Sequence, residues 1–246
     1  VKPNSWSGTS PSPIAGTDVI EIYYMDSDCG SNLVYPYTTG AQLFIASNGC
    51  GFEDGEALIV SDCRRADVFR GSFSASGGKI NVVHANNVNT ATKLKTEDSS
   101  DPAYVGNYGA DASLSRLKAV VFYVASNQNG IPALFKGLMN PPPSLNSVYQ
   151  PEELVDGVYD MQIRFGIDSS PPLTDTIFMA DSYNIAPANW QQVVSVEFCI
   201  SARSNDTGVV PSPQTLNNCD GSQSIVSDGR YRQSLTTLVG LRNLVQ

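Results

Sequence analysis

Histidine is almost missing from the chain, and this limits the chemistry that the chain can perform. His84 is the one histidine in 246 residues, and no G-x-S-x-G nucleophile elbow occurs. A serine triad needs a base, which is usually histidine. Because His84 closes an apolar segment at 79–84, its ordinary interpretation is a hydrogen-bonded surface residue. Metal-site spacing is missing too, since the cysteines form no C-x-x-C pair.

Positive charge and long apolar runs are also scarce. Lys and Arg number 15 against 24 Asp and Glu, giving a net charge of −9. A surface of that sign repels phosphate backbones, so nucleic acid is excluded as an expected partner. The longest purely apolar run covers only 119–125, far short of a membrane span. With 41% hydrophobic residues, the chain is still long enough to bury a substantial core.

Acidic residues occur in pairs that could in principle support glycoside hydrolysis. The pairs are Asp26 with Asp28, Glu53 with Asp54, Glu152 with Glu153, and Asp168 with Asp175. Adjacent acids on turns usually serve solubility or capping, and Glu152 and Glu153 suit the start of a short helix. We therefore predict that the chain is not an enzyme and has no catalytic residue, no cofactor and no metal ligand.

If the chain did bind a metal, calcium at Asp26 and Asp28 would be the candidate, because they offer hard oxygen ligands on a loop.

Short apolar segments separated by turn-rich loops fill the chain, which indicates a mainly β fold. The expected strands lie at 17–25, 41–47, 56–62, 66–73, 79–84, 193–204 and 231–243. The Asn-Gly pair at 129–130 predicts a hairpin between two apolar runs, with Pro132 opening the return strand. Both faces of 117–124 are apolar, which predicts a central strand covered on both sides.

The stretch 152–168 changes its period halfway. Leu154, Val155 and Val158 repeat at the spacing of one helical face, whereas the apolar residues from Met161 to Ile167 alternate as in a half-buried strand. We predict short helices over 150–159 and 180–192, joined to about ten strands. Strands come in runs rather than alternating with long helices, so we expect one mainly β (α+β) domain over 1–246, in which 1–16 is an irregular lead-in.

Five cysteines suit two disulfides in an oxidising compartment, with one cysteine left over. Cys199 lies in an expected strand and Cys219 in the polar loop after it, so a bond between them would contribute about 3 kcal/mol. Among Cys29, Cys50 and Cys63, three pairings are open. A Cys50–Cys63 bond closes the smallest loop and is the preferred pairing. A straight hairpin through 52–56 would hold Cys50 and Cys63 apart, and would favour a Cys29–Cys63 bond instead.

Five blocks of the sequence resemble the PilW family of type IV pilus minor pilins. They read GTDVIEIYY at 16–24, DGEALIVSDCRRADVF at 54–69, PEELVDGVYDMQIRFGID at 151–168, NWQQVVSVEFCISARS at 189–204 and YRQSLTTLVGLRN at 231–243. The blocks stand in the family's order. The related J-type pseudopilin of type II secretion has a larger head with two sheets, and 246 residues suit that plan.

The resemblance implies a pilin-like head with two antiparallel sheets and short helical inserts. Family members begin with a hydrophobic helix that anchors the subunit in the inner membrane, so we expect this chain to be a head from which that helix is absent. In such heads a helical turn leads into a strand that packs against the long helix. On that basis the residues Met161, Ile163, Phe165 and Ile167 would belong to the core.

The resemblance also implies a function without catalysis. We expect a minor pilin of the complex that primes type IV pilus assembly, supports twitching motility and adhesion, and helps present a tip adhesin. Its partners would be other minor pilins, the major pilin and a large adhesin, and it would touch the membrane only through the missing helix. It would start at the periplasmic face of the inner membrane and end at the pilus tip. The alternative is a secreted β-rich carbohydrate- or surface-binding adhesin module.

Overall fold

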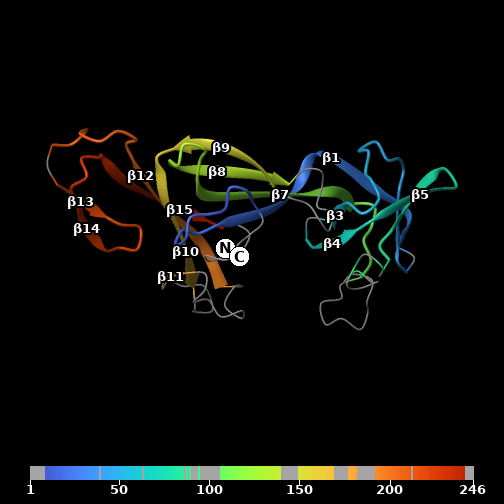
Figure 1. Ribbon diagram of the computed structural model, residues 1–246. Coiled ribbons are helices and arrows are strands. Elements are labelled where there is room, and N and C mark those ends of the chain that lie inside the picture. Colours follow the sequence, from blue (N-terminus) through green and yellow to red (C-terminus); the bar gives the residue numbers. More distant parts are fainter. Residues whose placement is uncertain are drawn as a thin grey trace. The chain divides into compact units, whose positions relative to one another are not determined.

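The computed structural model describes residues 9–38, 40–62, 64–85, 87, 89, 94, 106–139, 149–168, 177–181, 192–211 and 213–241. Its strands (Figure 1) are β1 (Ile20–Thr38), β2 (Gln42–Ile45), β3 (Ala57–Ser61), β4 (Ala66–Arg70), β5 (Ser72–Ser76), β6 (Lys79–Val83), β7 (Ser113–Ser126), β8 (Pro132–Met139), β9 (Tyr149–Asp156), β10 (Val158–Asp168), β11 (Ile177–Asp181), β12 (Val193–Arg203), β13 (Gln214–Asn217), β14 (Gln223–Val226) and β15 (Arg232–Gly240). These residues contain no α-helix, and none of their segments is a helix able to cross a membrane.

The chain divides into two compact units. Unit 1 consists of Val1–Glu21, Val120–Leu138 and Tyr149–Gln246, and unit 2 of Ile22–Ala119 and Met139–Val148. Both β1 and β7 therefore contribute residues to each unit. A single domain over 1–246 stays a prediction.

Unit 2 is an antiparallel sheet with the strand order β4-β3-β7-β1-β2-β6-β5. The strands β2 and β4 alternate as a half-buried sheet requires, and in β2 the side chains of Leu43 and Ile45 are fully buried. These two side chains join a core that includes Leu58, Val60 and Leu114. The five expected strands between 17 and 84 are therefore confirmed, although β1 runs on to Thr38 and the segment 66–73 forms parts of two strands.

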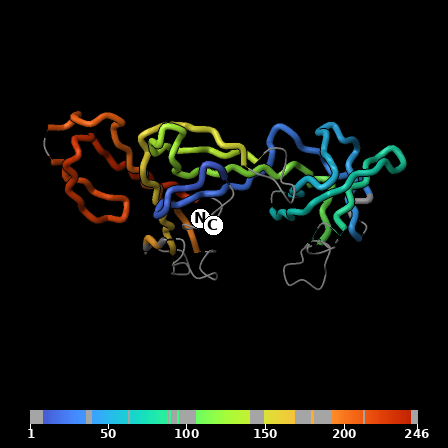
Figure 2. The backbone as a smooth tube through the Cα atoms, in the orientation of Figure 1, coloured from blue at the N-terminus to red at the C-terminus, as the bar shows by residue number. Residues whose placement is uncertain are grey.

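Unit 1 contains the β7–β8 hairpin, the strand β9 beside β8, and a second sheet with the order β11-β10-β12-β15. The predicted hairpin is confirmed: Ser126 pairs with Pro132, and Gly130 takes the positive φ of +73°. The burial of both faces of 117–124 is confirmed as well. The N-terminal segment runs beside β7 (Figure 2), where the Ile14 N–H donates to the carbonyl of Val124 at 2.8 Å.

The alternating stripe from Met161 to Ile167 is core, as predicted. All four side chains are at most 8% exposed. Among the described residues, the same apolar cluster includes Val124 of β7, Leu134 of β8, Ile20 of β1 and Ile14 of the N-terminal segment. The side chains that cover this stripe thus come from strands and an irregular segment of unit 1. Burial of each such side chain contributes about 2 kcal/mol.

The predicted helix over 150–159 is wrong, because this stretch forms β9 and the start of β10. Gly157 separates the two strands at φ +80°, donates its N–H to Pro132 at 2.7 Å and accepts from the Arg203 N–H at 2.8 Å. Leu154 and Val155 lie on an edge strand and stay exposed, so their helical spacing reflects no buried face. Pairing with β8 outweighs the weak local preference.

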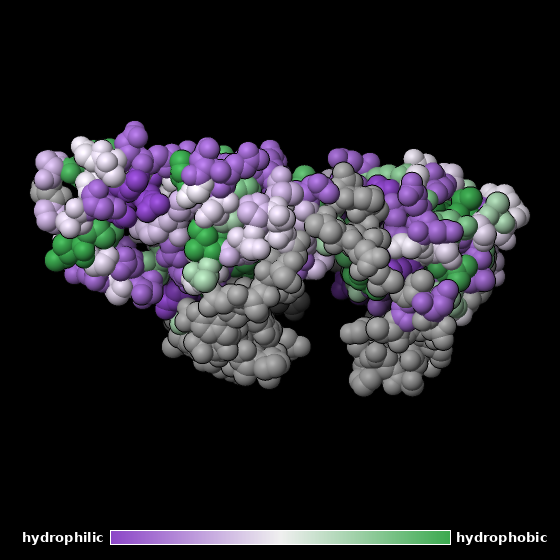
Figure 3. Space-filling view, in the orientation of Figure 1, coloured by the Kyte–Doolittle hydropathy of each residue, from purple (hydrophilic) through white to green (hydrophobic). Residues whose placement is uncertain are grey.

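Two further expectations concern the second half of the chain. The predicted helix over 180–192 lies almost wholly outside the described residues, and Ala180 and Asp181 belong to β11. The segment 205–228, expected as a polar loop, contains the two-stranded β13–β14 hairpin. Figure 3 shows apolar surface on this hairpin, where Ile225 is exposed.

Gly157 should be intolerant of any side chain. A Cβ atom there would lie 2.4 Å from the carbonyl oxygen of Arg203, in a backbone conformation that L residues avoid. We expect Gly157→Ala to lower the free energy of unfolding in urea by about 3 kcal/mol. Gly130→Ala is the control, because φ is also positive but nothing lies within 4 Å, and it should cost about 1 kcal/mol. Equal losses would contradict the role of the Arg203 contact.

Candidate functional site

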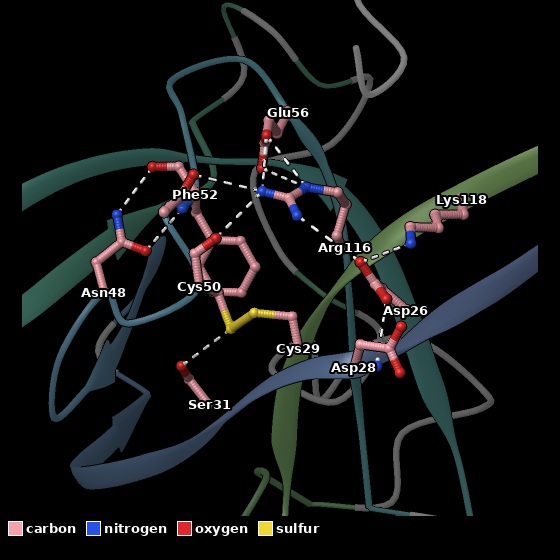
Figure 4. Close-up of a disulfide and its surroundings, with 11 residues drawn as sticks. Asp26, Asp28, Cys29, Ser31, Asn48, Cys50, Phe52, Glu56, Arg116 and Lys118 are labelled. Carbon is pink, nitrogen blue, oxygen red and sulfur yellow. Dashed lines mark hydrogen bonds and ion pairs between the residues drawn. A yellow bond between two sulfur atoms is a disulfide. The ribbon is translucent and has the colours of Figure 1, made fainter. Parts of the chain in front are cut away.

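A disulfide joins Cys29 of β1 to Cys50 in the turn after β2 (Figure 4). Asn48 holds this turn, since its Oδ1 accepts the N–H of Phe52 and its Nδ2 donates to the carbonyl of Phe52, both at 2.8 Å. The Ser31 hydroxyl lies 4.0 Å from the Cys50 sulfur. The bond thus fixes a compact turn to the middle of a long strand.

The preferred Cys50–Cys63 bond is not formed, because Cys50 is bonded to Cys29. Strand register supplies the physical reason. Leu33 of β1 pairs with Ile45 of β2, and continuing this antiparallel register brings Cys29 opposite the turn that carries Cys50. The sequence placed the first strand at 17–25, so this register could not be foreseen. The bond that is formed, Cys29–Cys50, is the third of the pairings that the sequence leaves open. Cys63 lies outside the described residues.

Arg116 of β7 is the centre of a charged cluster beside this disulfide (Figure 4). Its guanidinium lies 3.2 Å from the carboxylate of Glu56, which is only 5% exposed. It also donates to the carbonyls of Cys50 at 3.4 Å and Gly51 at 3.3 Å, and it covers the ring of Phe52 at 5.6 Å. One side chain therefore neutralises a buried acid and satisfies two carbonyls of the disulfide turn.

The calcium candidate Asp26 lies in the same cluster. Its carboxylate is buried, 3.0 Å from Lys118 and 3.7 Å from Arg116, and it accepts the N–H of Asp28 at 3.3 Å. The hydrogen bond from Lys118 lowers the pKa of Asp26, with help from the Asp28 N–H and against the effect of burial. Asp28 itself is exposed. Over the described residues, no three His, Cys, Asp or Glu side chains gather to hold a metal.

The other acids weighed for catalysis have separate structural surroundings. Asp54 accepts the N–H of Phe73 at 2.7 Å, Glu53 is exposed, and Glu153 accepts from the side chain of Asn127 at 2.9 Å. Asp168 is buried at the end of β10, whereas Asp175 lies outside the described residues. His84 was interpreted as a surface residue, which is wrong. It is 1% exposed, follows directly after β6, donates its backbone N–H to the carbonyl of Ala41 at 3.0 Å, and packs edge-on against Phe69.

A second disulfide joins Cys199 of β12 to Cys219 of the segment before β14. Both sulfurs are buried, and the Ser201 hydroxyl lies 3.3 Å from Cys219 and 2.8 Å from the hydroxyl of Ser234. The Gln214 side chain adds two bonds to the backbone of Arg232, of 2.6 and 2.9 Å. The β13–β14 hairpin is thereby tied to β12 and to the start of β15.

The strand β15 forms one edge of the four-stranded sheet, and its apolar side chains are uncovered. Leu235 pairs with Ile200 and Val239 with Val196, so both lie on the face that carries the core. They are nevertheless 64% and 46% exposed, and Leu238 on the opposite face is 62% exposed. No sequence signal distinguishes this strand from a buried one. Arg116 and Lys118, by contrast, are recognisable in the sequence as two cations that alternate directly before the apolar run 119–125.

Loss of Lys118 should make unit 2 more sensitive to acid. A depressed pKa means that charged Asp26 stabilises the fold fully above its unfolded pKa, about 3.9, and that this contribution is lost as pH falls through the folded value. Lys118→Met raises the folded pKa, so the acid-unfolding midpoint followed by circular dichroism should move to higher pH. Lys136→Met in β8 is the control and should leave the midpoint unchanged. The same shift in both variants would refute the Lys118–Asp26 contact.

Removing the second disulfide should loosen the hairpin in particular. The Cys199–Cys219 and Cys29–Cys50 bonds span 20 and 21 residues, so each double Cys→Ser variant should lose about 3 kcal/mol of stability. Hydrogen exchange followed by mass spectrometry distinguishes the effects of the two double variants. We expect faster exchange in 205–228 for Cys199→Ser with Cys219→Ser, and unchanged exchange there for the other pair. Equal exchange in both variants would contradict this role.

Comparison with known proteins places this architecture in a family. Residues 121–243, half of the chain, match the family described as type IV pilus-assembly protein W, or PilW. These residues include β8, β9, the β13–β14 hairpin and the four-stranded sheet β11-β10-β12-β15. No curated protein and no solved structure matches the chain. Three of the five sequence blocks, at 151–168, 189–204 and 231–243, lie within the match, which confirms the family resemblance. The chain belongs to the PilW family of type IV pilus-assembly proteins.

Proposed function

We propose that this chain is the head of a non-catalytic minor pilin in the priming and tip complex that initiates type IV pilus assembly, where it also helps present a tip adhesin. Membership of the PilW family supports a role in pilus assembly at the cell envelope. The finer role rests on the surface of the head. In such a role the protein works through complementary surfaces, which require no reactive cleft.

The uncovered strand β15 is the observation that carries the proposal. Its residues 234–240, SLTTLVG, contain no charge and expose Leu235, Leu238 and Val239. Exposed apolar clusters on a soluble domain mark interaction sites, and an edge strand also offers backbone groups for pairing. We assign this surface to a neighbouring minor pilin. Leu235 and Val239 lie on the same face of the sheet as the core residues of β12. A partner that covers them would therefore extend an existing apolar layer.

The disulfides support the proposed location. Two bonds between distant strands and turns form in oxidising compartments such as the periplasm and the cell exterior. They also resist extension, because each closes a loop that would otherwise unravel under load. The proposed subunit starts at the periplasmic face of the inner membrane, held by the helix that the family resemblance implies, and ends at the pilus tip.

Polar substitutions on β15 should weaken the assembly without unfolding the head. We expect Leu235→Ser with Val239→Ser to lower co-purification with co-expressed minor pilins by about tenfold or more, since two apolar side chains lose their burial in the complex. The same variant should reduce the number of pili in cells that lack the wild-type gene. Co-purification with candidate partners, followed by pilus counts in complemented cells, gives the two measurements.

Val68→Ser is the matched control for this experiment. Val68 lies on the edge strand β4, is 57% exposed, and falls outside the residues that match the family. It should leave co-purification and pilus number unchanged. Equal losses from both variants, or an unaffected β15 variant, would remove the assigned surface. Failure of the wild-type chain to bind any minor pilin would overturn the proposed function itself.

A further inference from the structure

Unit 1 has an open groove at the turn end of the β7–β8 hairpin, with a volume of about 750 Å³. Its lining comes from three places in the sequence: the N-terminal segment through Pro11, the hairpin turn through Gln128 and Asn129, and β9 through Pro151 and Glu153. Phe135 of β8 is 6% exposed and lines it as well. Such a volume lies within the range of small-ligand sites.

The groove has a fixed frame. Asn127 holds the turn, because its Oδ1 accepts the N–H groups of Asn129 and Ile131, both at 3.0 Å. Its Nδ2 donates to Glu153 at 2.9 Å and so ties β9 to the turn. Phe135 stacks on the buried ring of Tyr123 with centroids 5.6 Å apart. A ligand would therefore meet a turn backbone, a Glu153 carboxylate and a Phe135 ring that are already positioned, which lowers the entropy cost of binding.

The lining combines groups that suit hydroxyls with small apolar surfaces. The amides of Gln128 and Asn129 each donate and accept, and the carboxylate of Glu153 accepts at two oxygens, of which Asn127 uses one. Both amides and the carboxylate are exposed, as is Pro151. Planar amide and carboxylate groups match pairs of neighbouring hydroxyls, while proline rings pack against the C–H face of a sugar ring. The geometry points to a neutral saccharide as the ligand.

The charge of the groove favours neutral saccharides over anionic ones. Among the described residues that line the groove there is no Lys or Arg, and Glu153 supplies a negative charge. The chain as a whole carries −9. Sulfated or carboxylated sugars would be repelled by Glu153 and would find no compensating cation on these described residues. We therefore propose that this groove binds uncharged oligosaccharides, a binding activity beyond pilus assembly.

The test is a titration of the isotope-labelled chain with neutral disaccharides, followed by nuclear magnetic resonance. Lactose, maltose and diacetylchitobiose are the probes. We expect at least one of them to shift the side-chain amide signals of Gln128 and Asn129 and the backbone signals of 127–131. Glu153→Gln should weaken that binding by about tenfold, since charge-assisted hydrogen bonds are the strong ones. Gln128→Ala should weaken it as well.

Glu152→Gln is the matched control, because Glu152 neighbours Glu153 on β9, is exposed as well and is not among the described residues that line the groove. It should leave binding unchanged, and a sulfated heparin disaccharide should not shift the signals. Absence of shifts with all three neutral probes up to about 10 mM, shifts confined to other strands, or tighter binding of the heparin probe would each overturn the inference. Pilus assembly by β15 variants is a separate measurement, so failure here leaves the proposed function standing.

Discussion

The pairing of β10 with β12 is the interaction on which the family-matched half of the chain depends. It places Met161, Ile163 and Phe165 beside Ile200, Phe198 and Val196 on one face, and thereby creates the apolar layer that the N-terminal segment and the β7–β8 hairpin cover. The same register sends Cys199 to the opposite face, because neighbouring residues of a strand point to opposite sides. One ladder thus sets both the core and the anchor point of the second disulfide.

Long-range pairing also explains what could be predicted from the sequence. The alternation of Met161, Ile163, Phe165 and Ile167 is a local property, so it identified a buried strand face correctly. The spacing of Leu154 and Val155 is equally local but misleading, since pairing with β8 decides the conformation of β9. The Cys29–Cys50 bond depends on the β1–β2 register, and the Glu56–Arg116 pair joins residues 60 positions apart. Neither has a local signal.

Two of the edge strands of unit 1, β9 and β15, differ in their charge and proline content. The strand β9 carries Pro151, Glu152, Glu153 and Asp156, and charge and proline are the usual means by which an edge avoids pairing with another chain. The strand β15 has neither charge nor proline over 234–240. It exposes three large apolar side chains there, whereas the exposed Leu154 and Val155 of β9 stand directly between Glu153 and Asp156. Of these two edges, only β9 is therefore protected, which leaves β15 suited to a partner and β9 suited to face solvent.

When a force acts on a subunit through a partner bound at β15, the force must reach the core of the subunit without separating β15 from its sheet. The start of β15 is held by Gln214, and the hairpin that carries Gln214 is bonded through Cys219 to Cys199 in the middle of β12. A force on β15 would thus act on the full ladder between β12 and β15 and on a covalent bond to the adjacent strand. Because unzipping one end of the ladder would require moving the tethered hairpin, the disulfide protects the edge that we assign to a partner. This arrangement suits a surface that must keep its contacts under tension. It suits less well a site that has to change shape around a ligand.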